Sequence, residues 1–163
     1  VMAGNVLDDR IDLDAAKRVA EPLGIQFRKK CGPEIGDLLI VGRGATIGRL
    51  CRVNVDETFC LMGSVILVKP DRALLDERFL SGMLALPSMH AKLYKSSGSS
   101  AQQAIYLKDV KKLHCPLPPL ALQQTFATRI QAIEALKATH RTALAQLDAL
   151  FASLQQRAFA GEL

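Results

Sequence analysis

Residues 121–159 read ALQQTFATRIQAIEALKATHRTALAQLDALFASLQQRAF, a proline-free stretch rich in the helix formers Ala, Leu, Gln, Lys and Arg. Apolar residues recur along it at alternating spacings of three and four, which is the a/d pattern of a coiled-coil seam. Lys137 and His140 interrupt this seam in its middle. The seam residues that we expect to pair with another helix are Ile133, Leu144, Leu147, Phe151 and Leu154.

The predicted helix is too long for an ordinary compact domain. At 1.5 Å per residue it extends roughly 58 Å, whereas a compact chain of this size is only about 35 Å across. We therefore expect one long coiled-coil helix that projects beyond its own domain and needs a partner helix. A homodimer would supply that partner, with Lys137 and His140 fixing its register. The alternative is a helix packed lengthwise on its own domain.

The chain before this helix has the pattern of an α+β domain. Short apolar runs joined by glycine-rich turns predict a mixed or antiparallel sheet, with strands at 37–41, 47–55 and 60–69. Apolar stripes predict short helices at 77–86, capped by Asp76, and at 87–95, with one further helical turn at 107–113. The string CPLPPL at 115–120 separates the two regions because adjacent prolines cannot lie inside a helix.

The composition excludes several classes of protein. The chain has 163 residues, 49% of them hydrophobic, which is too many for a disordered chain. No apolar run approaches the roughly 20 residues that span a bilayer, and the first residues lack the layout of a signal peptide. The four cysteines form no CxxC pair, and the three histidines do not lie at zinc-ligand spacings. We expect a cytoplasmic protein with no cofactor, no metal and no membrane partner.

The stretch GRGATIG at 42–48 follows a predicted strand and looks like a dinucleotide-binding loop, although its glycine spacing is G-x-G-x-x-x-G. That motif requires a helix directly after the glycines, whereas the residues here predict a strand. We interpret the stretch as a hairpin turn whose glycines take positive φ. Arg43 and Arg49 then lie near its tip, where arginines can contact phosphates or base edges. A nucleotide-binding enzyme is the alternative, although no nucleophile, histidine and acid fall at a recognisable catalytic spacing.

Charge is distributed unevenly along the chain. Lys and Arg total 21 against 16 Asp and Glu, and residues 78–108 contain no acidic residue at all. This stretch surrounds SSGSS at 96–100, which predicts an exposed loop. Lysines attract phosphate regardless of sequence, while Gln, Ser and Arg can read base edges; the alternative is a solvated basic face. The candidate DNA-binding residues are Arg43, Arg49, Lys92, Lys95, Ser97, Ser99, Gln102 and Gln103.

Several stretches together resemble the specificity (S) subunit of type I restriction–modification systems, in its C-terminal half. They are GDLLI at 36–40, RGATIG at 43–48, PLPPL at 116–120, Gln123, and SLQQRAFAGEL at 153–163. The resemblance implies a target-recognition domain at 1–117 that reads one half of a split double-stranded DNA target. It also implies a conserved-region helix at 118–163, which pairs antiparallel with a second such helix and sets the spacing of the half-sites. Methyltransferase (modification) and restriction subunits supply the chemistry in that family.

The chain departs from the family pattern in three ways. Leu122 stands where the family usually has Glu, so any helix-start cap at that position is lost. The family's unit begins with further strands upstream, and full subunits carry two recognition domains and two helices. We therefore expect either a fragment of a two-domain subunit or a half-subunit that restores the pair by dimerising.

Two functional hypotheses follow. The first is a non-catalytic DNA-recognition subunit that scaffolds methyltransferase subunits through its helix. The second is a protein-interaction adaptor that uses the coiled-coil helix and has no specific DNA recognition.

Overall fold

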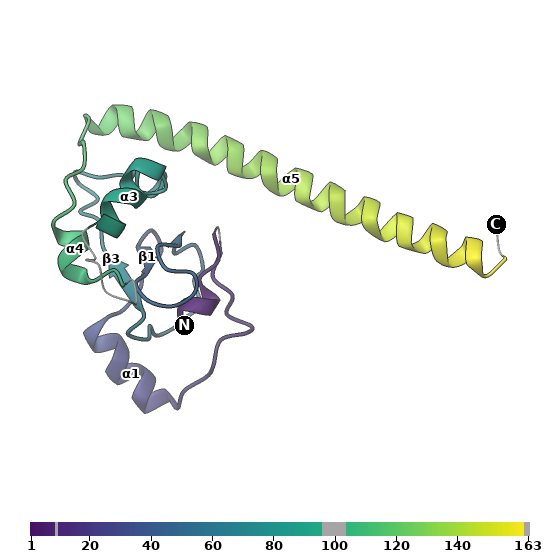
Figure 1. The fold of residues 1–163 in the computed structure, drawn as a ribbon, viewed down its shortest axis with the longest axis horizontal. Coiled ribbons are helices and arrows are strands. Elements are labelled where there is room, and N and C mark those ends of the chain that lie inside the picture. Colours follow the sequence, from purple (N-terminus) through teal and green to yellow (C-terminus); the bar gives the residue numbers. More distant parts are fainter. Residues whose placement is uncertain (9, 96–103, 162–163) are drawn as a thin grey trace. The chain divides into compact units, whose positions relative to one another are not determined.

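The computed structural model describes residues 1–8, 10–95 and 104–161. The chain divides into two compact units, Val1–Gln124 and Thr125–Leu163. The elements, in chain order, are η1 (Ala3–Asn5), α1 (Glu21–Lys30), β1 (Leu38–Val41), β2 (Leu50–Arg52), β3 (Val65–Val68), α2 (Glu77–Leu84), α3 (Pro87–Lys95), α4 (Leu107–Lys111) and α5 (Leu120–Phe159) (Figure 1).

A three-stranded antiparallel sheet forms the centre of the first unit. Its strand order is β2-β1-β3, and Leu39 of β1 lies opposite Cys51 of β2 and Leu67 of β3. The α+β prediction is confirmed. The second and third strands start later than the predicted 47–55 and 60–69 because turns occupy their first residues, and they end earlier, at Arg52 and Val68. Arg49 N–H donates to the Thr46 carbonyl at 3.1 Å, and Val65 N–H donates to the Met62 carbonyl at 3.0 Å.

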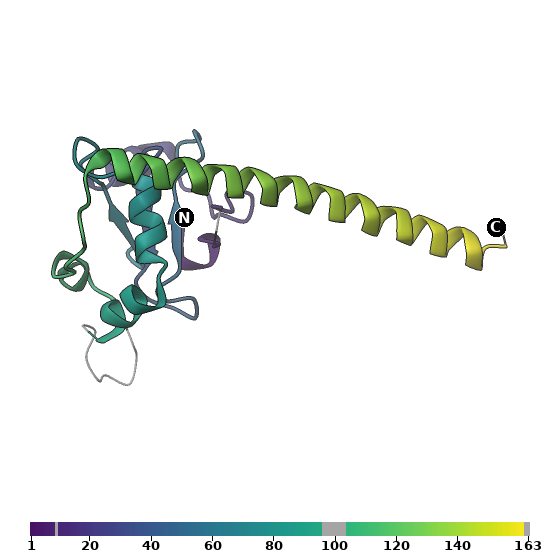
Figure 2. The ribbon, with the colours of Figure 1, turned by 90° about the horizontal axis from the view of Figure 1, so that it is seen from above.

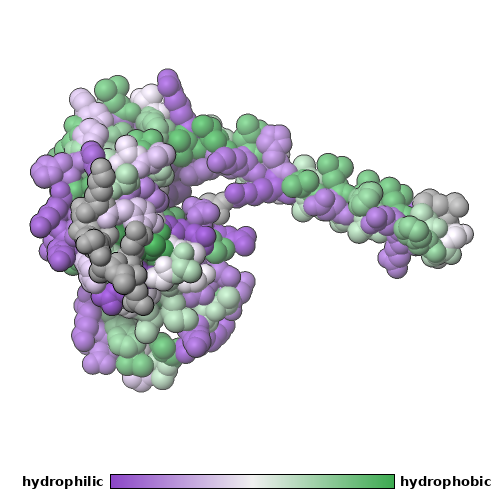
Figure 3. All heavy atoms as spheres, in the orientation of Figure 1, coloured by the Kyte–Doolittle hydropathy of each residue, from purple (hydrophilic) through white to green (hydrophobic). Residues whose placement is uncertain are grey.

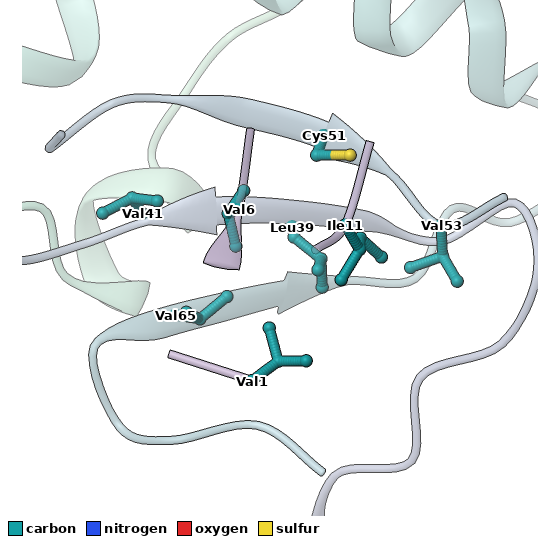
Figure 4. Packing of buried hydrophobic residues seen from close by; sticks show 8 residues of the cluster. All are labelled: Val1, Val6, Ile11, Leu39, Val41, Cys51, Val53 and Val65. Carbon is teal, nitrogen blue, oxygen red and sulfur yellow. The ribbon is translucent and has the colours of Figure 1, made fainter. Parts of the chain in front are cut away.

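Strand β1 is fully buried and separates two apolar clusters. Since side chains alternate across a strand, Leu39 and Val41 face one cluster while Leu38 and Ile40 face the other. The first cluster joins the sheet to the N-terminal segment (Figure 4); its buried members are Val1, Val6, Ile11, Leu39, Val41, Cys51, Val53 and Val65. The second joins the sheet to the helices; its buried members are Leu38, Ile40, Leu50, Leu80, Met83, Leu84 and Met89.

Helices α2 and α3 form where the sequence predicts them. The Asp76 carboxylate caps α2 by accepting from the N–H groups of Arg78 at 2.9 Å and Phe79 at 3.0 Å. Helix α2 ends at Leu84, two residues before the predicted end, and α3 begins at Pro87. A proline disfavours helical backbone in the residue before it, so it separates the two helices.

The structure adds α1, which the sequence did not reveal. Its termini carry ordinary helix signals, with Glu21 and Pro22 at the start and three basic residues in the last turn. No residue of α1 is buried. It therefore has no apolar stripe through which periodicity reveals a helix.

Helix α5 is a single helix of 40 residues, about 60 Å long (Figure 2). Every residue from Gln131 to Gly161 is exposed. Hydrophobic side chains lie along it among polar ones (Figure 3). Within the ranges that the structure describes, no helix is both long and apolar enough to cross a membrane.

Candidate nucleic-acid interface

The turn between β1 and β2 is the predicted glycine hairpin turn. Gly44 has φ +115° and Gly48 has φ +81°, values that side chains disfavour. The β1–β2 pairing is antiparallel, and no helix follows the glycines. The turn therefore lacks the geometry of a dinucleotide-binding loop, which places a helix N-terminus against the pyrophosphate.

Arg43 belongs to a cluster of two cations around one aromatic ring. Its guanidinium lies 5.1 Å from the centre of the Tyr106 ring, and the Lys108 ammonium lies 5.5 Å from the same centre. The three residues are exposed. An aromatic face attracts cations, at exposed sites by about 0.5–1 kcal/mol each, and so offsets the repulsion between the two charges. We call Arg43, Tyr106 and Lys108 the cation–aromatic cluster.

Backbone hydrogen bonds bring the two parts of the cluster together. Ile105 N–H donates to the Gly42 carbonyl at 2.8 Å, which places Tyr106 beside Arg43. The buried Asp109 carboxylate accepts from Tyr106 N–H at 2.9 Å and fixes the start of α4, from which Lys108 extends. The cluster is therefore held by contacts between residues far apart in the sequence.

Arg49, the other arginine predicted to contact DNA, lies in a different environment. Its Nε is 3.0 Å from the Asp8 carboxylate, and its Nη1 donates to the Val6 carbonyl at 3.3 Å. These contacts tie β2 to the N-terminal segment, and the carboxylate partly neutralises the guanidinium. Arg49 thus has an acidic partner, which Arg43 lacks among the described residues.

The remaining predicted DNA-binding residues lie near or beyond the end of α3. Lys92 is exposed on α3, and Lys95 is the last residue of that helix. Four residues lie outside the described part of the chain: Ser97, Ser99, Gln102 and Gln103. The structure thus brings Arg43 together with Tyr106 and Lys108, which were not selected as site residues. Lys108 stood in the acid-free stretch, but nothing in the sequence linked Tyr106 to Arg43.

Gln123 and Asp37, which lie in the stretches that resemble the family, are buried and structural. The Gln123 side chain accepts from Asp76 N–H at 2.9 Å and donates to the carbonyls of Leu74 at 3.0 Å and Pro118 at 2.8 Å. It thereby fastens the first turn of α5 to the segment before α2. Neither residue is available to contact a ligand, since both are at most 2% exposed.

Asp37 organises the entry to β1. Its carboxylate accepts from Glu34 N–H at 2.8 Å and lies 2.9 Å from the Lys69 ammonium, which is also 3.2 Å from Glu34. Burial is the largest single influence on Lys69 and lowers its pKa. The hydrogen bonds and charges of Asp37 and Glu34 together outweigh it, so the pKa of Lys69 is raised.

The predicted helix-pairing residues are all exposed, by 41 to 62%: Ile133, Leu144, Leu147, Phe151 and Leu154. Leu136 and Leu150, which were not predicted, are each 57% exposed. Both fall at the g position of the heptad, directly before Lys137 and Phe151. They widen the apolar stripe on one flank, and Leu136 adds an apolar residue where the seam itself is polar.

We find neither a metal-binding site nor a thiol-based catalytic site among the described residues. No group of three or more His, Cys, Asp or Glu side chains there can hold a metal ion. The four cysteines are thiols and not disulfides. Burial raises the pKa of the Cys31 and Cys115 thiols, which disfavours the reactive thiolate.

Comparison with known proteins places the chain in one class of protein. Residues 15–149 match the family described as the type I restriction modification DNA specificity domain, and the chain belongs to that family. Among curated proteins it is similar to the type I restriction enzyme EcoBI specificity subunit of Escherichia coli. The two are 27% identical over 163 residues, which are 98% of this chain and 34% of that subunit. The resemblance drawn from the sequence motifs is confirmed.

Solved structures of the same kind share the fold. One comes from work on complex assembly and conformational transition of the type I R-M system; it is 26% identical, with a TM-score of 0.59 over 81% of this chain and 32% of that one. The HsdS subunit from Thermoanaerobacter tengcongensis is 20% identical, with a TM-score of 0.54 over 72% of this chain and 31% of that one. The chain thus spans about a third of the length of these relatives.

Proposed function

We propose that this chain acts as a specificity subunit, or half-subunit, of a type I restriction–modification complex. In this role it reads one half of a bipartite double-stranded DNA target. It performs no catalysis, and methyltransferase and restriction subunits supply the chemistry. Its long helix pairs with a second copy or a second half-subunit and scaffolds the methyltransferase subunits.

The observation that carries this proposal is the cation–aromatic cluster on the surface of a DNA-specificity domain. Arg43 and Lys108 present two positive charges beside one ring. Among the described residues neither cation forms an ion pair. Such cations suit DNA phosphates, which release counterions when a protein neutralises them.

The proposal is tested by selecting binders from a random duplex library and measuring affinity by fluorescence anisotropy at several salt concentrations. We expect one sequence to be enriched. Arg43→Gln and Lys108→Gln should each reduce the slope of log K against log salt by about one, the value for one lost phosphate contact. Lys29→Gln removes an exposed cation from α1 and serves as the charge control. Binding without any enriched sequence that vanishes with salt would contradict specific recognition.

The exposed apolar seam of α5 favours the adaptor as a second candidate function. If the helix alone is the functional part, Arg43, Lys92 and Lys95 can be changed to Glu without loss of function. If the DNA proposal is correct, the same triple substitution abolishes DNA binding and leaves helix pairing intact.

A further inference from the structure

At each end of the 42–48 turn stands a glycine, and another part of the chain occupies the space that its side chain would need. A Cβ on Gly48 would lie 2.5 Å from the Tyr94 hydroxyl and 3.0 Å from its Cζ. A Cβ on Gly42 would lie 2.7 Å from the Ile105 carbonyl oxygen. Real Cβ atoms essentially never approach other atoms so closely, so a Cβ at Gly42 would push the Ile105 backbone away and one at Gly48 would displace the Tyr94 side chain.

Hydrogen bonds join the same partners. The Tyr94 hydroxyl donates to the Ile47 carbonyl, and Ile105 N–H donates to the Gly42 carbonyl at 2.8 Å. Tyr94 is in the last turn of α3, whereas Ile105 precedes α4. The turn is therefore held at its first residue by the segment before α4 and near its end by α3.

Gly44, in the middle of the turn, is different. Its φ is +115°, but an added Cβ would have Ala3 Cβ at 3.6 Å as its nearest neighbour, an ordinary contact. Gly44 is required by backbone conformation alone, Gly42 by close approach alone, and Gly48 by both. Substitution of Gly44 therefore serves as a control that separates the effect of backbone strain from the effect of losing the contacts with Tyr94 and Ile105.

We propose that Tyr94 and Ile105 clamp the 42–48 turn and so hold Arg43 over Tyr106 as a DNA phosphate contact, with Tyr94 as a positioning residue. The inference rests on the proposed function, because the clamp would support a residue that contacts DNA. Gly42 and Gly48 allow Ile105 and Tyr94 to approach the turn closely. Protein atoms therefore occupy the space that a nucleotide phosphate would need beside these glycines. Holding a flexible arginine in place before binding reduces the conformational entropy lost on binding.

The clamp can be tested without DNA. The Tyr106 ring shifts the resonance of any proton held over its face, so we expect the Arg43 side-chain Nε–H to have a displaced chemical shift in a ¹H–¹⁵N spectrum. Gly42→Ala forces the Ile105 carbonyl away and should return that shift to the ordinary arginine value. Gly44→Ala should lower stability through backbone strain yet keep the displaced shift.

The same variants are then tested in the full chain with the enriched DNA sequence. Gly42→Ala should reduce the salt slope by about one, as Arg43→Gln does, and the double variant should show no further reduction. Tyr94→Phe keeps the ring and removes the hydroxyl that donates to the Ile47 carbonyl, so a loss of about threefold in affinity is expected. Urea unfolding of each variant shows whether it is folded under the assay conditions.

The outcomes separate the two proposals. A wild-type chain with no sequence preference contradicts the proposed function, whatever the spectrum shows. If wild-type binding is specific, but Gly42→Ala and Tyr94→Phe keep the wild-type salt slope and the Arg43 shift, the clamp is wrong. If Gly42→Ala does not fold, the test uses Tyr94→Phe, Arg43→Gln and the double variant that combines them. Losses of DNA affinity that add in the double variant would overturn the clamp. A double variant that binds DNA as well as Arg43→Gln alone would support it.

Discussion

Gln123 makes three hydrogen bonds from one fully buried side chain, two to the segment before α2 and one to the proline string. A buried amide of this kind is costly to remove because its partners lose their hydrogen bonds without gaining water. We predict that Gln123→Ala lowers the free energy of unfolding by about 3 kcal/mol, roughly 1 kcal/mol for each lost hydrogen bond. Urea unfolding measures this, with Gln131→Ala, an exposed glutamine of the same helix, as the control. Equal effects of the two substitutions would contradict the structural role of Gln123.

Lys69 makes the stability of the first unit depend on pH in the alkaline range. Its pKa is raised above the ordinary 10.5 in the folded protein. The contribution of its pairing is therefore fully present below pH 10.5 and is lost as the pH rises through the folded-state pKa. We predict that wild type is more stable than Lys69→Met at neutral pH and that the difference shrinks in strongly alkaline buffer. Lys17→Met, at an exposed lysine, should show no such convergence in urea unfolding across this range.

The first turn of helix α5 lacks the charge that would complement the helix dipole. Its first turn contains no acidic residue, and Leu122, where the family usually has Glu, is 61% exposed. A carboxylate near a helix N-terminus interacts favourably with the helix dipole. We predict that Leu122→Glu raises the free energy of unfolding by about 0.5 kcal/mol at low salt. Leu122→Gln controls for the loss of the apolar surface, and a gain as large with Gln as with Glu would rule out the dipole as the cause.

Elements whose apolar residues recur at helical spacing, or whose ends carry a cap or a proline, could be predicted from the sequence. The stripe and cap of α2, the proline at the start of α3 and the seam of α5 all marked helices at nearly the observed residues. Helix α1 could not be predicted, because it buries no residue and so imposes no spacing on its apolar side chains. The first residues of β2 and β3 also differed from the prediction, because hydrogen-bonded turns occupy positions where the residue types still favour a strand.

The site was predictable only in part, for a similar reason. Arg43 was identified because it lies in a glycine turn, where side chains are exposed. Its partner Tyr106 was not, because their proximity depends on the backbone pairing of Gly42 with Ile105. Local sequence patterns carry no information about which distant segments pair. The helix-pairing and DNA-contact assignments remain predictions.

At the scale of the whole molecule, the exposed seam predicts self-association through α5. Leu147 lies at a d position of the heptad and is 62% exposed. We predict that wild type is a dimer at tens of micromolar by light scattering and that Leu147→Lys shifts it to monomer, because the substitution places a charge in the seam. Gln156→Lys adds the same charge at an f position on the opposite face and should leave the dimer intact. A wild-type monomer at these concentrations would contradict pairing between identical copies.

The anchoring of Tyr94 and Ile105 has a consequence for protein engineering. The two residues are attached to the same turn by separate contacts, so the turn joins the end of α3 to the segment before α4. When sequences are exchanged between relatives, an exchange that keeps Tyr94, Ile105 and residues 42–48 together therefore preserves both contacts. An exchange that replaces only one of these three parts is expected to break at least one of them.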